Sequence, residues 1–559
     1  MSELICRMRY VFSCLLLAVL MTGTATADPE QFFVSPDGQF SAKAIVLTRV
    51  NGEYYLFLPG NMERDGLKIG CRTGDEATLN GKPITGNETA ADLQEHNEIV
   101  IGQKKYDFTV MQGSKGLPAL YITTATGGLD RIHQSKKNKE AGTLILTDGA
   151  GGQLYDGALE HIKMRGNAST AYPKKNYQIK LDQSTDLFGM GKAKKWILTG
   201  NWLDKSLIRN EMTYDLAEFI GMPYTPQRQQ AELFINHEYF GLYLFTEKIE
   251  IRKSRIDIRD LEKETEKLNK GELSDYPKKV KQLRGDASVK AYRIPSDPED
   301  ITGGYLVEFE YIKSKYDAEP SGFRTKRKIG VVIKSPEYAS EAQAEYIYQF
   351  MQGFENAIFA EDGIDPDTGK HYYEFVDMES LAMKYMINEF SQNYDGNSSS
   401  EFFYKPADSE SEKAYAGPVW DLDNTYADYA QDYNREQLLS PRHLFIGEAS
   451  KARYWWPNIY KHREFKGTVQ DLYERVFGQG VRIILGEEKD PAGTLKSLDE
   501  YSAGIAASAE MNYARYPMLA YDTGKIQTGK NLDENIEYLR RFIRGRKEYL
   551  EEVWFLIPE

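Results

Sequence analysis

Residues 162–181 read I-K-M-R-G-N-A-S-T-A-Y-P-K-K-N-Y-Q-I-K-L and predict a hairpin whose strands are joined by a turn of small residues. Such a turn lets backbone N–H groups approach phosphate oxygens closely. Lys180 lies in the second strand, where its ammonium can reach a phosphate as a point charge. A lysine near a strand end is more often simply solvated. The stretch is therefore open to two interpretations, a phosphate site or an ordinary surface hairpin.

The hairpin belongs to a block of mixed strands and helices that runs from near Leu117 to about residue 435. Residues 205–220 carry apolar side chains every three to four positions, which predicts an amphipathic helix. Asp204 fits an N-cap for this helix, and Gly221 fits its stop. Further along the block, the sequence predicts a hairpin at 231–245, a strand at 304–309, and helices near 340–360 and 377–392.

Different patterns flank and interrupt this block. Residues 28–113 contain short strand-like runs with turn signals such as Asn51-Gly52, which predicts a β-sandwich module. Residues 436–559 are rich in helix formers and predict a helical C-terminal part. Residues 259–300 are densely charged and weakly apolar, and we interpret them as a solvated helical insertion. The sequence therefore predicts an α+β protein with an N-terminal β-sandwich module.

The first 27 residues have the order of a secretory signal peptide. Arg7 and Arg9 form a basic start, and residues 11–21 are an apolar run too short to cross a bilayer and stop there. Residues 25–27, A-T-A, supply a small-residue cleavage site. A buried N-terminal helix is the alternative. The pattern predicts removal of residues 1–27 and an extracytoplasmic protein, either secreted or held at the cell surface or in the periplasm.

The bulk composition disfavours several classes of protein. The 559 residues carry a formal net charge of −14 at pH 7, which makes nucleic acid and anionic membranes poor partners. No segment after residue 27 approaches the ~20 apolar residues of a membrane span. Signal cleavage leaves Cys71 as the one cysteine. A single cysteine excludes an internal disulfide and cysteine-based zinc sites.

Two aspartates stand close together in V-W-D-L-D-N-T, residues 419–425. If this stretch is a strand, Asp421 and Asp423 point to the same face. Two carboxylates on one face repel each other unless a cation lies between them, and Mg²⁺ prefers one or two carboxylates together with phosphate oxygens. The pair is suited to a metal-bound nucleotide. The alternative is two solvated aspartates at a strand end.

A third aspartate, Asp395, lies in the short polar stretch N-Y-D-G-N at residues 393–397. An aspartate in such a loop can orient or deprotonate a hydroxyl group. Asp-Gly is also a common turn dipeptide, so a plain turn is the alternative. The sequence contains no G-x-S-x-G nucleophile elbow and no P-loop, which argues against those two enzyme classes.

Taken in order, these pieces resemble the CotH (spore coat protein H) family of atypical protein kinases. The resemblance covers roughly residues 117–430 and rests on several motifs in the family's order, none decisive alone. The matching stretches are residues 117–118, 164–167, 174–181, 195–198, 202–210, 236–247, 303–308 and 420–423.

The resemblance implies a divergent protein-kinase-like fold over residues 114–559 that transfers the ATP γ-phosphoryl group, with Mg²⁺ or Mn²⁺, to Ser or Thr of an exported protein. In such enzymes catalysis is mostly positioning and charge neutralisation. By position, the resemblance implies nucleotide-binding roles for Arg165, Asn167, Lys180 and Glu247, a catalytic-loop role for Asp395, and metal binding by Asp421 and Asp423. Lys180 resembles the phosphate-binding strand lysine, and Glu247 its partner or a pocket residue.

The sequence also departs from the kinase pattern. A kinase catalytic loop has Asn five residues after its Asp, where this chain has Ser400. A catalytically degenerate binding or structural protein of the cell surface is therefore an alternative. A second alternative is a haloacid-dehalogenase-type phosphatase, because residues 421–425 fit D-x-D-x-T with Asp421 as nucleophile. The poor strand character of residues 414–419 counts against that phosphatase.

Overall fold

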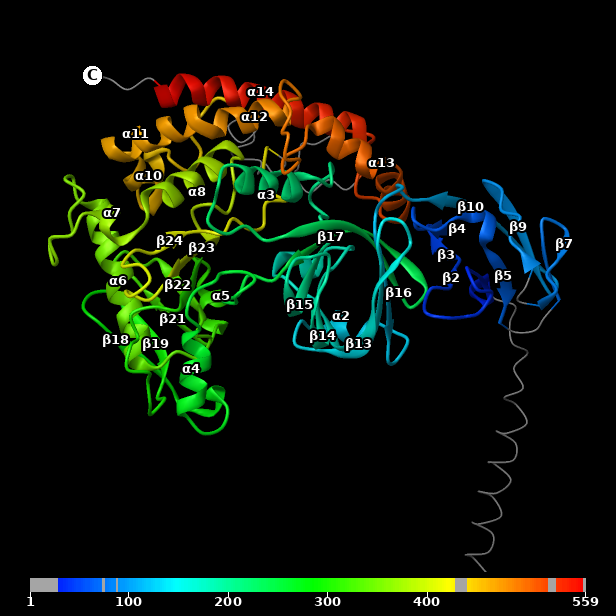
Figure 1. The fold of residues 1–559 in the computed structure, drawn as a ribbon, viewed down its shortest axis with the longest axis horizontal. Coiled ribbons are helices and arrows are strands. Elements are labelled where there is room, and N and C mark those ends of the chain that lie inside the picture. Colours follow the sequence, from blue (N-terminus) through cyan, green and yellow to red (C-terminus); the bar gives the residue numbers. More distant parts are fainter. Residues whose placement is uncertain (1–28, 73–75, 87–88, 428–439, 521–528, 556–559) are drawn as a thin grey trace, which may run out of the picture.

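The computed structural model describes residues 29–72, 76–86, 89–427, 440–520 and 529–555. The predicted signal peptide, residues 1–27, lies outside these ranges. Strands predominate up to Ser335, and helices predominate from Glu341 onward (Figure 1). The α+β class is thus confirmed. Within the described ranges, no helix is both long and apolar enough to cross a membrane.

The N-terminal part is built from two sheets, drawn in blue in Figure 1. One sheet has the strand order β2-β1-β5-β8 and the other the order β3-β4-β10-β9-β6-β7. Apolar residues of both sheets, among them Val34 and Ile99, enter a single core, so this part is β-rich as predicted. The strands are β1 (Phe32–Ser35), β2 (Ile45–Val46), β3 (Thr48–Val50), β4 (Glu53–Leu58), β5 (Lys68–Cys71), β6 (Ala77–Leu79), β7 (Lys82–Pro83), β8 (Thr89–Ala90), β9 (His96–Ile101) and β10 (Lys104–Gln112).

A closed barrel of seven strands follows, in the order β11-β12-β13-β14-β15-β17-β16. The predicted hairpin is confirmed: it is the end of β13 and the start of β14, with Ile162 opposite Ile179. Side chains alternate along each strand. Those that point inward form the apolar core of the barrel, and those that point outward lie on its outer surface. The strands are β11 (Ala119–Thr124), β12 (Glu140–Thr147), β13 (Gln153–Arg165), β14 (Asn176–Asp186), β15 (Lys192–Thr199), β16 (Arg228–Ile235) and β17 (Glu238–Glu247), with the short helix α2 (Asp130–Gln134) beside them.

The N-terminal sheets are joined to the barrel and to a late helix by one buried carboxylate. Glu232 of β16 is fully buried and accepts a hydrogen bond from the Gly60 backbone at 2.9 Å. Ser508 donates its hydroxyl to Glu232 at 2.7 Å and accepts the Ser114 N–H at 2.8 Å. Three parts of the chain that are far apart in sequence therefore meet at Glu232.

A second, seven-stranded sheet has the order β18-β19-β21-β22-β20-β23-β24. Every neighbouring pair in it is antiparallel. Its strands are β18 (Lys278–Gln282), β19 (Ser288–Tyr292), β20 (Tyr305–Glu310), β21 (Ser321–Arg324), β22 (Gly330–Ser335), β23 (Ser399–Lys405) and β24 (Tyr415–Ala416).

The interpretation of residues 259–300 as a solvated helical insertion is wrong for most of its length. Only α4 (Leu261–Leu268) is an α-helix there, whereas β18 and β19 belong to the sheet. Val289 and Ala291 of β19 are buried in the main core. The strand signal was hidden because β18 is an edge strand with three lysines, a composition that protects an exposed edge from pairing with other chains.

Helices cover the seven-stranded sheet and cross the top of the molecule in Figure 1. Capping boxes at Ser340 and Ser497 start the two helices α6 and α13. The predicted helical C-terminal part is confirmed over the described residues. The helices are α3 (Arg209–Phe219), α5 (Lys313–Ala318), α6 (Glu341–Phe359), α7 (Tyr372–Phe375), α8 (Met378–Phe390), α10 (Trp455–Tyr460), α11 (Arg463–Leu472), α12 (Gly478–Ile484), α13 (Leu498–Arg515) and α14 (Leu532–Phe555).

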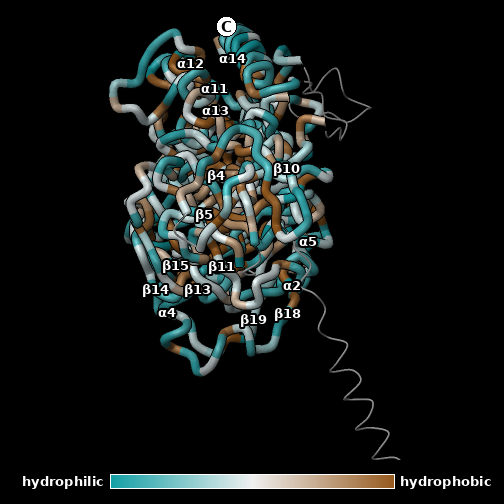
Figure 2. Tube along the Cα trace, turned by 90° about the vertical axis from the view of Figure 1, so that its right-hand side faces the viewer, coloured by the Kyte–Doolittle hydropathy of each residue, from teal (hydrophilic) through white to brown (hydrophobic). Residues whose placement is uncertain are grey.

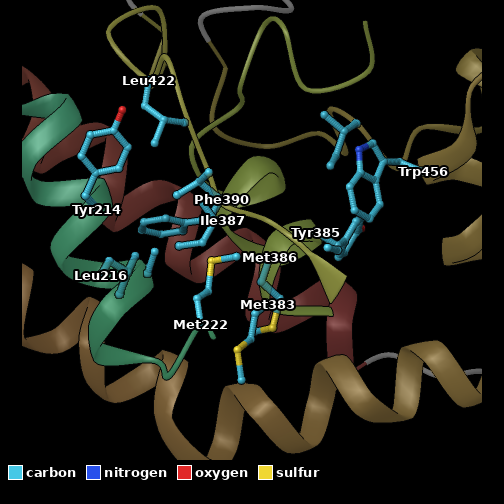
Figure 3. Packing of buried hydrophobic residues seen from close by; sticks show 14 of the residues in the cluster. Tyr214, Leu216, Met222, Met383, Tyr385, Met386, Ile387, Phe390, Leu422 and Trp456 are labelled. Carbon is cyan, nitrogen blue, oxygen red and sulfur yellow. The ribbon is translucent and has the colours of Figure 1, made fainter. Parts of the chain in front are cut away.

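One large core unites these helices with the sheet. Figure 2 shows apolar segments gathered inside the trace and hydrophilic ones, such as much of α14, towards its surface. In Figure 3, Tyr214 of α3, Phe390 of α8 and Leu422 all belong to this core. Leu422 stands between the two predicted metal ligands, so the core fixes the backbone that carries them.

Candidate functional site

A cleft lies between the outer wall of the barrel and one face of the seven-stranded sheet. Its volume is about 700 Å³, within the range of small-molecule sites. The barrel contributes residues of β13, β14 and β15, the sheet contributes residues of β20, β22 and β23, and residues 248–252 connect the two walls. Trp420 and Arg165 line the cleft, with the guanidinium 5.2 Å from the centre of the indole ring.

The barrel wall of the cleft is basic. Lys163, Lys180 and Lys195 line it together with Arg165. The strand register explains why they gather: Lys180 lies opposite Lys195, and Lys163 lies opposite Gln178, so their side chains leave the barrel on the same side. Burial and the neighbouring cations lower the pKa of Lys163. An anionic ligand would relieve this repulsion.

Part of the cleft is apolar. Ile197 of the barrel wall, Ile249 of the connection, and Leu306 and Phe402 of the sheet line it. Leu306 and Phe402 are buried in a small cluster that Ile249 also contacts. Flat aromatic ligands prefer such walls because burial of apolar surface is favourable. The arrangement provides a slot for a planar ring with basic side chains further along the barrel wall.

The sheet wall also carries acidic side chains. Glu308 and Glu319 line it and share Lys334, whose ammonium lies 3.5 Å from Glu308 and 3.4 Å from Glu319. Burial raises the pKa of Glu308, and the Lys334 and Arg165 charges oppose that rise. The cleft is thus positive on the barrel side and largely acidic on the sheet side.

Asp421 directly follows Trp420 of the cleft. The expectation that residues 419–425 form a strand is wrong: they form a loop after β24, and Asp421 has a positive φ of 63°. A non-glycine residue in this region is strained, and such residues cluster at functional sites. Ser400, which also has a positive φ, lies with its hydroxyl 3.5 Å from the Asp421 carboxylate.

The surroundings of Asp421 set its charge. The carboxylate reaches solvent, but the protein around it displaces bulk water and raises its pKa. The nearby Arg165 charge and the Ser400 hydroxyl favour the charged form and limit the rise. A carboxylate that lacks full hydration and has one nearby cation is well suited to bind a second cation.

Helix α3 holds the loop that carries Asp421 and Asp423. The Asn210 carbonyl accepts the Leu422 N–H at 2.8 Å, and the Tyr214 hydroxyl lies 3.4 Å from the Asp421 nitrogen. Burial raises the pKa of the Tyr214 hydroxyl, and the charges of Asp421 and of the partly buried Asp423 add to the rise. The two aspartates therefore stand at the same helix, although no strand aligns them.

A buried ion pair also holds the loop that carries Asp421 and Asp423. Asp204 accepts the backbone N–H groups of Ser206 and Arg209, both at 2.8 Å, and pairs with the Arg209 guanidinium. Arg209 in turn donates to the Thr425 carbonyl at 3.1 Å. Asp204 was predicted to cap the helix, and it acts just before the first turn instead, because α3 begins at Arg209.

Asp395 lies in the loop between α8 and β23. Its backbone oxygen accepts the N–H groups of Ser398 and Ser399, and Trp456 donates to the adjacent Gly396 carbonyl at 2.7 Å. Burial, followed by the charge of Asp421, raises the pKa of Asp395 to about 7. The charge of Asp421 therefore reaches Asp395, so the structure places these two carboxylates in the same region.

The other predicted nucleotide-binding residues differ in placement. Lys180 lines the cleft, where it is paired with Glu160 at 2.6 Å. Asn167 lies at the exposed hairpin turn and accepts a hydrogen bond from Lys136 at 2.9 Å. Neither Asn167 nor Glu247 is among the residues that line the cleft.

Glu247 is fully buried beneath the cleft. Its carboxylate accepts the Tyr224 hydroxyl and the Gln227 N–H, both at 3.0 Å, and lies 3.4 Å from Arg255. These contacts hold β17 to the segments on either side of it. Glu247 therefore has a structural role: it stabilises the chain next to residues 248–252, which connect the two walls of the cleft.

Several residues of the site were missed from the sequence, among them Lys163, Lys195 and Tyr214. The signal for α3 was present in W-L-D-K-S-L-I-R-N, residues 202–210, whose polar members hold the Asp421 loop. Alternation along β13 also places Lys163 beside Arg165. Only the barrel's closure shows that these outward positions face a second sheet.

Asp421 and Asp423 provide only part of the ligands that a cation such as Mg²⁺ needs. Among the residues that the structure describes, no group of three or more His, Cys, Asp or Glu side chains is arranged to hold a metal ion. Mg²⁺ commonly binds through one or two carboxylates and completes its shell with phosphate oxygens and water. Asp421 and Asp423 suit this mode and do not form an all-protein cage.

Comparison with known proteins shows the family of the chain. No curated protein matches the chain. A family model described as CotH kinase protein matches residues 162–550, which is more than two thirds of the chain and spans the barrel hairpin, the cleft, Asp395 and the Asp421 loop. The chain therefore belongs to the CotH kinase protein family.

Proposed function

We propose that this protein is an exported atypical protein kinase that transfers the ATP γ-phosphoryl group to Ser or Thr of another secreted or surface protein. One observation carries the proposal: a basic wall and an apolar slot share one cleft, and Asp421 directly follows Trp420 of its lining. The charge of Asp421 acts in turn on Asp395. Family membership supports a kinase-like protein. The signal-peptide pattern of residues 1–27 supports export.

The cleft can bind a nucleotide along its length. The base would fit the slot between Ile197 and Leu306, and the phosphates would face Lys163, Lys180 and Arg165. Arg165 connects the phosphate-binding wall with the proposed metal ligand. It lines the cleft, and its charge also opposes the raised pKa of Asp421. A phosphate group bound there lies next to the predicted metal ligand.

Asp421 and Asp423 would hold Mg²⁺ or Mn²⁺, and such an ion would supply positive charge that offsets the charge of the phosphates. The loop that carries both aspartates is fixed by Asn210 and by the buried Leu422. Ser400 stands where a kinase has its second metal-ligating Asn, and its hydroxyl lies by Asp421.

Asp395 would accept the proton of the acceptor hydroxyl while that oxygen bonds to the γ-phosphorus and ADP leaves. Its pKa near 7 lies close to neutral pH, where a general base is most effective. The atoms balance: the phosphoryl group moves from ATP to the acceptor oxygen, and the proton moves to Asp395. Burial is the main cause of this raised pKa; the Asp421 charge adds to the rise and the Lys315 charge opposes it.

The test is transfer of labelled γ-phosphate from ATP to a Ser-rich peptide or to the protein itself, with Mg²⁺ and then Mn²⁺. Asp421→Asn and Asp395→Asn should each reduce transfer at least 10²-fold, the value of one oriented charge-stabilising contact. Asp107→Asn, on exposed β10, is the matched control. Transfer unchanged in both site variants would overturn the assignment.

Two alternatives have distinct signatures. A degenerate kinase-like binding protein would bind ATP and metal without transferring phosphate to any acceptor. A haloacid-dehalogenase-type phosphatase would form an aspartyl-phosphate on Asp421. The second alternative is disfavoured because Asp421 follows the edge strand of an antiparallel sheet, whereas ligands of open α/β folds bind at the carboxyl ends of parallel strands.

A further inference from the structure

An exposed surface of mixed apolar and basic character borders Asp395. It consists of Tyr311, Ile312, Lys315, Arg453 and Tyr454, and we name it the acceptor rim. Tyr311 and Ile312 remain 42% and 47% exposed. Large apolar side chains that stay exposed next to one another are a mark of interaction sites. The cleft described above does not include these five residues.

The acceptor rim is tied directly to the Asp395 loop. The Tyr311 N–H donates to the Ser398 carbonyl at 2.9 Å, and Ser398 donates its own N–H to Asp395 at 2.7 Å. Glu310, one residue earlier, pairs with Ser399 in the sheet. Two backbone hydrogen bonds thus link the rim to the loop that carries Asp395.

Aromatic contacts hold the two halves of the rim together. The Tyr311 and Tyr454 rings are 5.7 Å apart, edge to face. The Arg453 guanidinium lies over both, 5.3 Å from the Tyr311 centre and 4.5 Å from the Tyr454 centre. The Arg453 guanidinium also donates a hydrogen bond to the Tyr454 hydroxyl, which holds it against the two rings.

The rim's two cations are not neutralised by a close ion pair. In the described part of the chain, neither Arg453 nor Lys315 forms a salt bridge, whereas nearby Lys313 pairs with Asp317. Lys315 acts electrostatically on Asp395 and Asp421, so it faces the site from α5. Charge complementarity points to an anionic partner.

We propose that the acceptor rim docks the phosphate-accepting segment of the substrate, a Ser or Thr flanked by Asp or Glu and by an apolar residue. The inference rests on the proposed kinase function and adds to it the class of acceptor sequence. An acidic side chain meets Arg453 or Lys315, and the apolar one covers Tyr311 and Ile312. The segment then crosses the loop at Asp395 with its hydroxyl towards the γ-phosphoryl group.

The test compares three Ser peptides, flanked by Asp and Glu, by Lys and Arg, or by neutral residues, as acceptors of labelled phosphate. The wild type should prefer the acidic peptide by about tenfold or more in kcat/KM, because complementary charges across an interface set specificity. Arg453→Glu should raise the KM for the acidic peptide about tenfold, improve the basic peptide, and leave the KM for ATP unchanged. Lys315→Glu should act in the same direction and also lower kcat.

Lys82→Glu with Lys105→Glu is the matched control, since both lysines are exposed on the N-terminal sheets. Fluorescence anisotropy with the labelled acidic peptide provides a readout that needs no transfer. A wild type with no peptide preference, or an Arg453→Glu variant with unchanged peptide binding and KM, would overturn the inference. Failure of all peptides together with failure of autophosphorylation would count against the kinase function, while anisotropy would still decide the rim.

Discussion

The side-chain carbonyl of Asn210 accepts the backbone N–H of Leu422 at 2.8 Å, which ties helix α3 to the loop between the two predicted metal ligands. Asn210 also donates to Asn201 at 2.9 Å, so the amide is held from both ends. A residue on an early helix therefore controls the position of carboxylates more than two hundred residues later.

Replacing Asn210 should impair the site without unfolding the protein. Asn210→Ala removes the acceptor of the Leu422 N–H, which costs about 1–3 kcal/mol for a buried group left unpaired. The loss should appear as a weaker affinity for Mg²⁺ or Mn²⁺ and about tenfold slower phosphate transfer. Metal titration and a thermal melt separate these effects. Thr468→Ala, at a half-buried residue of helix α11, is the control; unchanged metal affinity in Asn210→Ala would contradict the role.

The pH dependence of transfer should report Asp395. Its pKa is raised to about 7 in the free protein, and a base must be deprotonated, so kcat/KM should rise with pH up to about 7 and then level. Lys315 opposes the raised pKa, so Lys315→Met should move this limb to higher pH. The pH–rate profile of both proteins measures the shift. If the rising part of the pH–rate profile stays at the same pH in Lys315→Met, Lys315 does not influence the pKa of Asp395.

Nucleotide affinity should depend on two cations of the barrel wall. Lys163 has no salt-bridge partner among the described residues, whereas Lys180 is held by Glu160 at 2.6 Å. Lys163→Met should weaken nucleotide binding by about tenfold, the loss of one charged phosphate contact. Lys180→Met should weaken it less, and Glu160→Gln should free Lys180 and strengthen it. Isothermal titration with ATP and metal measures all three, and Lys326→Met is a matched surface control.

The buried pair of Asp204 and Arg209 should be essential for stability. Both side chains are fully buried, and removal of one partner leaves an unpaired charge in the interior. Asp204→Ala should therefore destabilise the protein by about 3–5 kcal/mol. Chemical denaturation gives the free energy of unfolding. Asp182→Ala, an exposed aspartate of β14, should change it little.

Stability should also fall as pH rises towards neutrality because of Glu232. Burial without a cation raises its pKa from 4.5 to about 7. The folded state then holds a proton that the unfolded state has released, so this contribution is complete below about pH 4.5 and is lost as pH rises to about 7. The difference is on the order of 3 kcal/mol. Glu232→Gln, which mimics the neutral acid, should flatten unfolding free energy across this window; an unchanged slope would exclude Glu232 as its source.

The sequence predicted elements well where side-chain periodicity was strong. The hairpin of residues 162–181 and the helix at 209–219 follow from alternating or helical apolar positions. The prediction that Asp395 and Asp421 belong to one site came from family order, and in the structure the charge of Asp421 acts on Asp395. The strand at 419–425 failed because the left-handed backbone at Asp421 is imposed by tertiary contacts with α3, which periodicity cannot report.

Other parts of the site could not be read from the chain. Lys163 and Lys195 look like ordinary solvated residues until the barrel closes and a second sheet covers them. Glu247 is a charged residue at a strand end and was expected to bind nucleotide, yet its carboxylate is buried and accepts the Gln227 N–H. Whether an outward position faces water or another sheet depends on packing between distant elements.

The contacts of Glu232 constrain the order in which the chain can complete its fold. Gly60 and Ser508 are separated from Glu232 by 172 and 276 positions, and Ser114 from Ser508 by 394. Contacts of such sequence separation form late, since the intervening loop must first be closed. As the chain emerges from its N-terminus, the β-sheets of the first hundred residues cannot be sealed against the barrel until α13 has also emerged. The first part made is therefore among the last to be locked in place, and it must stay soluble with an unfinished face while it waits.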